Sequence, residues 1–115
     1  MAVIAKSVAA AECAYVASWI GLGIGDTGEP VQFGGAPDRS VHVFGSFSGG
    51  ASIVIQGSND GLNWFTLTNP LGGDLIFTAD GGKAITELTR HVRPVVSGGD
   101  GSTDLDVVLC MGTAK

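Results

Sequence analysis

The sequence contains two histidines, His42 and His91, and these are the residues best suited to acid–base chemistry or metal binding. Neither has a cysteine or a carboxylate at ligand spacing on its own predicted strand, and a metal site needs such a cluster. The serines lack the Gly-x-Ser-x-Gly context of a nucleophile elbow. We therefore predict no catalytic residues and no enzyme activity, and we interpret both histidines as surface or packed side chains.

Three aspartates near the end of the sequence, Asp100, Asp104 and Asp106, lie beside glycines. Oxygen-rich loops of this kind are able to hold calcium. The ligand order of an EF-hand is absent, however, and aspartates are routine at turns and strand ends. The glycines between residues 21 and 28 do not form a phosphate-binding loop, because no Lys-Ser/Thr pair follows them. We predict no metal ion and no cofactor.

The two cysteines, Cys13 and Cys110, lie near opposite ends of the sequence. Two isolated cysteines do not have the spacing of metal ligands. We interpret them as small buried hydrophobic residues in terminal strands. A disulfide between them requires that these strands be neighbours, which the sequence leaves open.

The charge balance excludes two classes of partner. The 115 residues include 6 Lys and Arg against 11 Asp and Glu, which gives a net charge of −5. Proteins that bind nucleic acid or anionic membranes need a basic surface, so we expect neither partner. Glu12 interrupts the apolar run near the start of the chain, which argues against a signal peptide. Synthesis in the cytoplasm is expected.

The clearest structural pattern is a hairpin over residues 51–68. Ile53 and Ile55 alternate with polar or smaller residues, and an Asn-Asp-Gly sequence then predicts a tight turn. We interpret Trp64, on the second strand, as a hairpin or core aromatic residue rather than a platform for sugars. The residues assigned to this structural hairpin are Asn59, Asp60, Gly61 and Trp64.

Further strands are predicted at residues 30–33, 40–47, 74–79, 90–96 and 104–110. Turn signals separate them at short intervals, and the chain contains 19 glycines. This pattern predicts an all-β, single-domain β-sandwich or jelly-roll of about seven to nine short antiparallel strands. Pro94 is expected at a sheet edge or a bulge, because proline cannot donate a ladder hydrogen bond.

The start of the chain is predicted to differ from the rest. Residues 1–28 are assigned to an N-terminal arm with the first strand, and residues 29–115 to the β-domain. Residues 2–11, rich in small side chains, resemble a short helix or a flexible arm. The apolar side chains proposed to contact a partner from this arm are Val3, Ile4, Val8, Tyr15 and Trp19.

Two segments resemble discoidin-type jelly-rolls. These are Gly57-Ser-Asn-Asp-Gly-Leu-Asn-Trp64 and Thr89-Arg-His-Val-Arg-Pro94. The resemblance implies carbohydrate or lipid binding through loops at one end of the domain. The chain is shorter than those domains and lacks a recognisable set of exposed aromatic residues at such loops. A carbohydrate-binding β-module, for example in a phage tail or adhesion apparatus, is therefore the alternative function.

A longer stretch, from Val41 to Leu109, resembles small structural proteins of tailed bacteriophages, of the head decoration or cement type. The resembling segments are the hairpin and the later sequence from Ala84 to Thr103. This resemblance implies a non-enzymatic virion protein that bridges neighbouring capsid subunits on the outer surface. The implied partners are the major capsid protein and further copies of this chain, with a trimer expected because decoration proteins often occupy three-fold positions. A head and a tail location both remain open.

Overall fold

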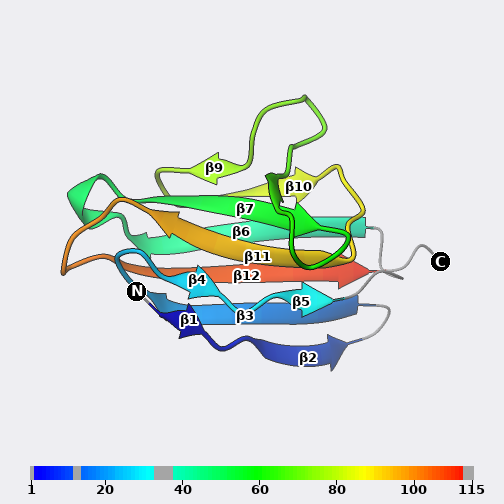
Figure 1. Cartoon of the computed structure of the whole chain (residues 1–115), viewed down its shortest axis with the longest axis horizontal. Helices are drawn as coiled ribbons and strands as arrows, with labels where there is room; N and C mark the ends of the chain where they lie inside the picture. Colours follow the sequence, from blue (N-terminus) through cyan, green and yellow to red (C-terminus); the bar gives the residue numbers. More distant parts are fainter. Residues whose placement is uncertain (1, 12–13, 33–37, 113–115) are drawn as a thin grey trace.

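Two β-sheets and one short 3-10 turn, Ser48–Gly50, make up the regular structure of the described residues (Figure 1). The structure, a computed structural model, describes residues 2–11, 14–32 and 38–112. Every longer element in these ranges is a strand, so the prediction of an all-β fold is confirmed. The chain forms one globule with two sheets.

The first sheet is seven-stranded and runs in the order β1-β4-β11-β7-β8, with β5 also paired to β11 and β9 to β7. Its neighbours are antiparallel except for β1 and β4, which are parallel. Its strands are β1 (Val3–Ile4), β4 (Thr27–Gly28), β5 (Val31–Gln32), β7 (Ser52–Ser58), β8 (Phe65–Thr66), β9 (Ile76–Phe77) and β11 (His91–Ser97).

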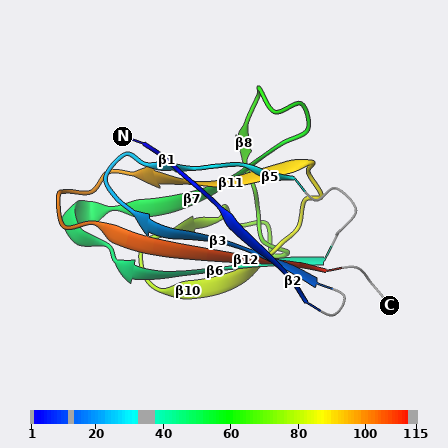
Figure 2. The ribbon, with the colours of Figure 1, turned by 90° about the horizontal axis from the view of Figure 1, so that it is seen from below.

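The second sheet is five-stranded and fully antiparallel, in the order β10-β6-β12-β3-β2. Figure 2 shows the two sheets as layers, one above the other. The strands of the second sheet are β2 (Ser7–Ala11), β3 (Ala14–Leu22), β6 (Asp38–Ser46), β10 (Gly81–Ile85) and β12 (Asp104–Gly112). The described residues thus contain twelve strands, more than the predicted seven to nine, because several are only two residues long.

One hydrophobic core lies between the two sheets, and strict alternation along the strands builds it. Ile53 and Ile55 of β7 are buried, as are Leu105, Val107 and Leu109 of β12, and all five belong to the same cluster. The side chains between them point away from the core. Each large aliphatic side chain buried in this way contributes roughly 1.5–3 kcal/mol. The predicted alternation of these segments is confirmed.

Pro94 lies on an interior strand, contrary to the prediction of an edge or a bulge. Strand β11 pairs with β7 along its whole length on one side. On its other side, the described pairings involve His91, Val92 and Val95 but not Pro94, because β5 and β4 are separate short strands there. The missing proline N–H therefore falls where the neighbouring strand is interrupted, and no ladder hydrogen bond is lost.

The first residues of the chain also differ from the prediction of a short helix or a flexible arm. Residues 2–11 contribute β1 to the seven-stranded sheet and β2 to the five-stranded sheet. The segment therefore crosses from one sheet to the other along one side of the molecule (Figures 1 and 2). Small residues without turn signals carry a weak local preference, and pairing with β3 and β4 decides their conformation.

Gly28 offers a sharp test of how tightly this side of the fold is packed. A Cβ atom added at Gly28 would lie 2.5 Å from Pro94 Cδ and 2.8 Å from Trp19 Cδ1. We expect Gly28→Ala to lower the free energy of unfolding by about 1–3 kcal/mol, because the core must be overpacked to admit the methyl group. Urea denaturation followed by circular dichroism measures this change.

Gly101→Ala is the matched control, because a Cβ at Gly101 would meet nothing within 4 Å and its φ lies outside the left-handed region. The control should change the free energy of unfolding by no more than about 0.5 kcal/mol. Equal effects of the two substitutions would contradict the close approach of Gly28, Trp19 and Pro94.

Candidate functional site

The loop between β7 and β8 is held by the Asp60 carboxylate. Its Oδ1 accepts hydrogen bonds from the backbone N–H groups of Leu62 and Asn63, both at 2.8 Å, and from Ser58 Oγ at 2.9 Å. The Asn63 side-chain amide donates to Asp60 Oδ2 at 2.8 Å. These bonds, led by the one from the Asn63 backbone, hold the pKa of Asp60 well below its ordinary value. The loop is thus tied together by its own hydrogen bonds although its carboxylate is exposed.

The predicted tight turn is wider than two residues. Strand β7 ends at Ser58 and β8 begins at Phe65, so residues 59–64 form the connection. Gly61, at φ +78°, supplies the left-handed conformation that the sequence predicted for this glycine. The Asp60 side chain bonds to successive N–H groups of its own loop, which favours the wider connection over a two-residue turn.

Trp64 lies half-buried over the outer face of the seven-stranded sheet. The Arg93 guanidinium carbon is 3.9 Å from the centroid of the indole ring, and the His91 ring meets the indole edge-on at 6.2 Å. Arg93 Nε also donates to Gln56 Oε1 at 3.0 Å. Asn59 ties the loop to the start of β11 by accepting the Arg90 N–H at 3.3 Å. One face of the indole is therefore covered by a cation.

The predicted contact residues of the arm divide into two groups. Val3, Val8 and Tyr15 are exposed, by 69%, 42% and 40%, while Ile4 is partly buried against the core. Trp19 is only 1% exposed, so its prediction as a contact residue for a partner is wrong. Trp19 and Ala17 both point to the inner face of β3, and the core takes up the large apolar ring of Trp19.

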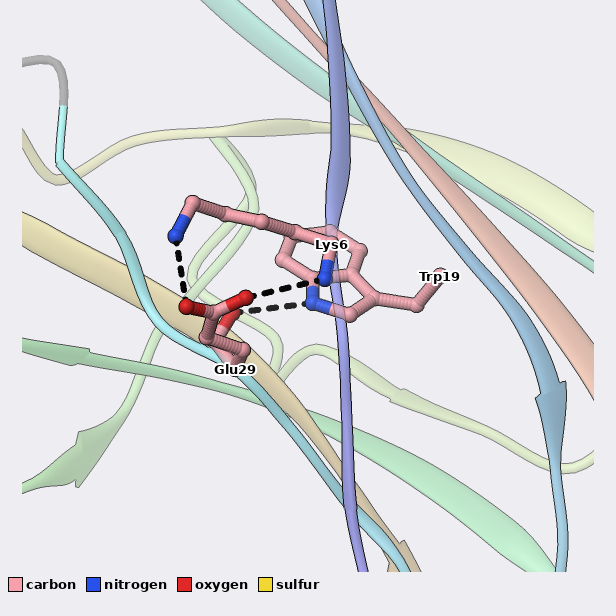
Figure 3. A network of polar contacts seen from close by, with 3 residues as sticks. All are labelled: Lys6, Trp19 and Glu29. Carbon is pink, nitrogen blue, oxygen red and sulfur yellow. Dashed lines mark hydrogen bonds and ion pairs between the residues drawn. The ribbon is translucent and has the colours of Figure 1, made fainter.

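Glu29 fastens the N-terminal segment across the side of the molecule (Figure 3). Its carboxylate accepts the backbone N–H of Lys6 at 3.2 Å and pairs with Lys6 Nζ at 3.1 Å. Its backbone carbonyl accepts the indole N–H of Trp19 at 2.9 Å. The bond from the Lys6 backbone, with the pairing to its ammonium group, lowers the pKa of Glu29. A spacing of 23 residues between Lys6 and Glu29 gave no sequence signal for this contact.

The outer face of the five-stranded sheet presents two neighbouring rows of side chains with no charged group. Each row crosses all five strands, and the outward direction follows from the burial of the alternate residues. We call these ten positions the uncharged band. The first row is Ala9, Val16, Cys110, Ser40 and Ala84, and the second is Ser7, Ser18, Val108, His42 and Gly82.

The uncharged band stands out in a chain whose net charge is −5. Four strand spacings of about 4.8 Å give it a width of about 19 Å between the outermost strands. Aspartates border it at both ends of β12 and β6, at Asp104 and Asp106 on one side and Asp38 on the other. An uncharged centre with a charged rim is the usual anatomy of a protein–protein interface. Sequence reasoning missed this band because it could not tell which strands are neighbours.

The two histidines lie on different sheets and are not brought together. His42 belongs to the uncharged band and lies 4.9 Å from the Phe44 ring, while His91 packs beside Trp64. The aspartates of the C-terminal loop serve local bonds: Asp100 accepts from Ser48 Oγ at 2.9 Å, and Asp106 accepts the Gly21 N–H at 3.0 Å. Within the described ranges, no group of three or more His, Cys, Asp or Glu side chains is placed to hold a metal ion.

Cys110 is exposed on the outer face of β12, so its prediction as a buried residue is wrong. Its neighbours Leu109 and Met111 take the inward positions, and alternation turns Cys110 outward. Cys13 lies outside the described residues, as does any pairing between the two cysteines.

A shallow cavity of about 240 Å³ lies between β9 and β10 and is lined by residues 76–83. Lys83 Nζ lies 5.8 Å from the centroid of the Phe77 ring. Asp80, also in this lining, accepts the Gly45 N–H at 3.1 Å. One ammonium group and one hydrogen-bonded carboxylate do not make a nucleophile with a base, so this cavity supplies no catalytic arrangement.

Comparison with known proteins places the chain in no family. No protein-family model, curated protein or solved structure matches it. In the part of the chain that the structure describes, no helix is long and apolar enough to cross a membrane.

The lowered pKa of Asp60 predicts that the conformation of its loop depends on pH. Because its folded-state pKa is lowered, its stabilisation is fully present above the unfolded value of about 3.9 and is lost as the pH falls below that value. We expect acidification below about pH 4 to increase quenching of Trp64 fluorescence by acrylamide. Asp60→Ala should give that increased quenching already at pH 7, while buried Trp19 stays protected. Identical quenching in the two proteins at pH 7 would contradict the role of Asp60.

Proposed function

We propose that the chain is a non-enzymatic structural protein of a bacteriophage virion, which decorates the capsid and cements neighbouring capsid subunits. The uncharged band carries this proposal. Ten neighbouring positions on one sheet face lack any Asp, Glu, Lys or Arg, although the chain as a whole is acidic. A surface of this kind is suited to burial against another protein.

The strand order supports the jelly-roll form of the fold. With β4 and β5 counted as one element and β8 and β9 as another, the sheets read β3-β12-β6-β10 and β4/β5-β11-β7-β8/β9. Successive elements from β3 to β12 pass between the sheets, except that β7 and β8/β9 are neighbours in one sheet, and this order is that of an eight-stranded jelly-roll. Jelly-rolls occur in viral capsid domains and in lectins, so the fold alone does not choose between the two functions.

The charge distribution favours the outer surface of a capsid over its interior. A protein that faces packaged DNA needs cations, and this chain carries 6 against 11 acidic residues. On the outer surface, the band would meet the major capsid protein, with further copies of the chain at equivalent positions. Weak contacts repeated by the symmetry of the shell add up to strong attachment. The chain would thus reach the virion after synthesis in the host cytoplasm.

Val108→Asp tests the band directly, because Val108 lies on the central strand of the five-stranded sheet. A carboxylate there would be buried unpaired in the proposed interface, which costs several kcal/mol. We expect at least tenfold weaker binding to phage particles that lack this chain, measured by co-sedimentation, with an unchanged circular dichroism spectrum.

The matched control is Val54→Asp. Val54 is also a half-buried valine on the outer side of an interior strand, but it belongs to the other sheet. The Val54→Asp variant should bind phage particles within about twofold of the unmodified chain. Full binding by the Val108 variant, or equal loss in both variants, would contradict docking through the uncharged band.

A carbohydrate-binding module is the second candidate, supported by the half-buried Trp64 on a hydrogen-bonded loop. Figure 2 shows β8 and the loop beside it rising from the layer of the seven-stranded sheet. The weakness of this second candidate is that Arg93 already covers one face of the indole. Saturable glycan binding that is lost in Trp64→Ala with the fold intact would favour this function over capsid decoration.

A further inference from the structure

The described sheet edges are protected against pairing with other chains, with one exception. The seven-stranded sheet ends in β1 on one side and in β8 and β9 on the other, and each of these strands has only two residues. The five-stranded sheet ends on one side in β10, which carries Lys83 and two glycines. Short strands and lysines are the usual devices that prevent edge-to-edge association. Strand β2, at the remaining edge, has neither.

Strand β2 is a five-residue edge of sequence Ser-Val-Ala-Ala-Ala, without charge, proline or glycine. It pairs with β3 in a continuous register with no bulge, and no described strand lies beyond it (Figure 1). Every second residue of such a strand directs its N–H and C=O groups away from its neighbour. Ser7, Val8, Ala9 and Ala10 are all exposed. The edge is therefore open to another strand.

We propose that β2 pairs with β2 of a second copy of this chain, antiparallel and about a two-fold axis. An isologous contact requires a surface that is complementary to itself. A strand of small, uncharged side chains meets this requirement, because no like charges and no bulky groups oppose each other. The register that pairs all five residues places Ala9 opposite Ala9 of the partner copy, with Ser7 opposite Ala11 and Val8 opposite Ala10.

This pairing joins two five-stranded sheets into one of ten strands. Residues directly opposite each other in antiparallel strands lie on the same face of the sheet. Ala9 belongs to the uncharged band, so both bands come to lie on one face. The combined band spans nine strand spacings, about 43 Å. The inference does not rest on the proposed capsid function, since it concerns only copies of this chain, but it would make any docking through the band bivalent.

Opposite charges at position 9 test both the interface and its register. We expect the unmodified chain to have the mass of two copies by sedimentation equilibrium at about 100 µM, a concentration that reveals even weak pairing. Ala9→Lys and Ala9→Glu should each sediment as single chains, because like charges then face each other across the two-fold axis. An equimolar mixture of the two variants should restore the mass of two copies.

Ala84→Lys is the matched control, because Ala84 is an exposed alanine at the opposite edge of the same sheet. It should leave the pairing intact. Restored association in the mixture also excludes misfolding as the reason for the single-chain mass. A mass of one or three copies for the unmodified chain would overturn the proposal. Persistent pairing of the Ala9→Lys variant would also overturn it, as would dissociation of the Ala84→Lys variant.

Discussion

The burial of one face of each sheet against the other is the constraint on which the rest of the structure depends. Alternation along β7 and β12 directs Ile53, Ile55, Leu105, Val107 and Leu109 inward. The residues between them therefore face outward, because successive side chains of a strand point to opposite faces of the sheet. The character of each outer surface is therefore set by every second residue, and on the five-stranded sheet ten of these residues form the uncharged band.

The N-terminal segment completes both sheets and closes the side where they meet. Its passage from β1 to β2 is held by Glu29, which binds the backbone and side chain of Lys6 and the indole N–H of Trp19 (Figure 3). Trp19 packs close to Gly28, which has no side chain to obstruct it. Ordering this segment places an uncharged strand at the sheet edge, where Ser7 and Ala9 complete the two rows of the uncharged band.

The sequence predicted the parts of the fold that local patterns encode. The alternation of Ile53 with Ile55 and the left-handed Gly61 both follow from short-range rules. Pro94 and Trp19 were mispredicted because their surroundings come from distant segments: an interrupted strand in one case and a shared core in the other. The uncharged band was missed for the same reason, since its two rows exist only once five separated strands are in register.

The proposed function leads to a definite number of copies on a particle. Decoration at repeated positions of a capsid requires that this chain be present in proportion to the shell protein. Quantitative mass spectrometry of density-purified phage particles, with the major shell protein as the internal reference, measures that proportion most directly. Capsid decoration predicts a copy number comparable with that of the shell protein. A few copies per particle, or none, would contradict it.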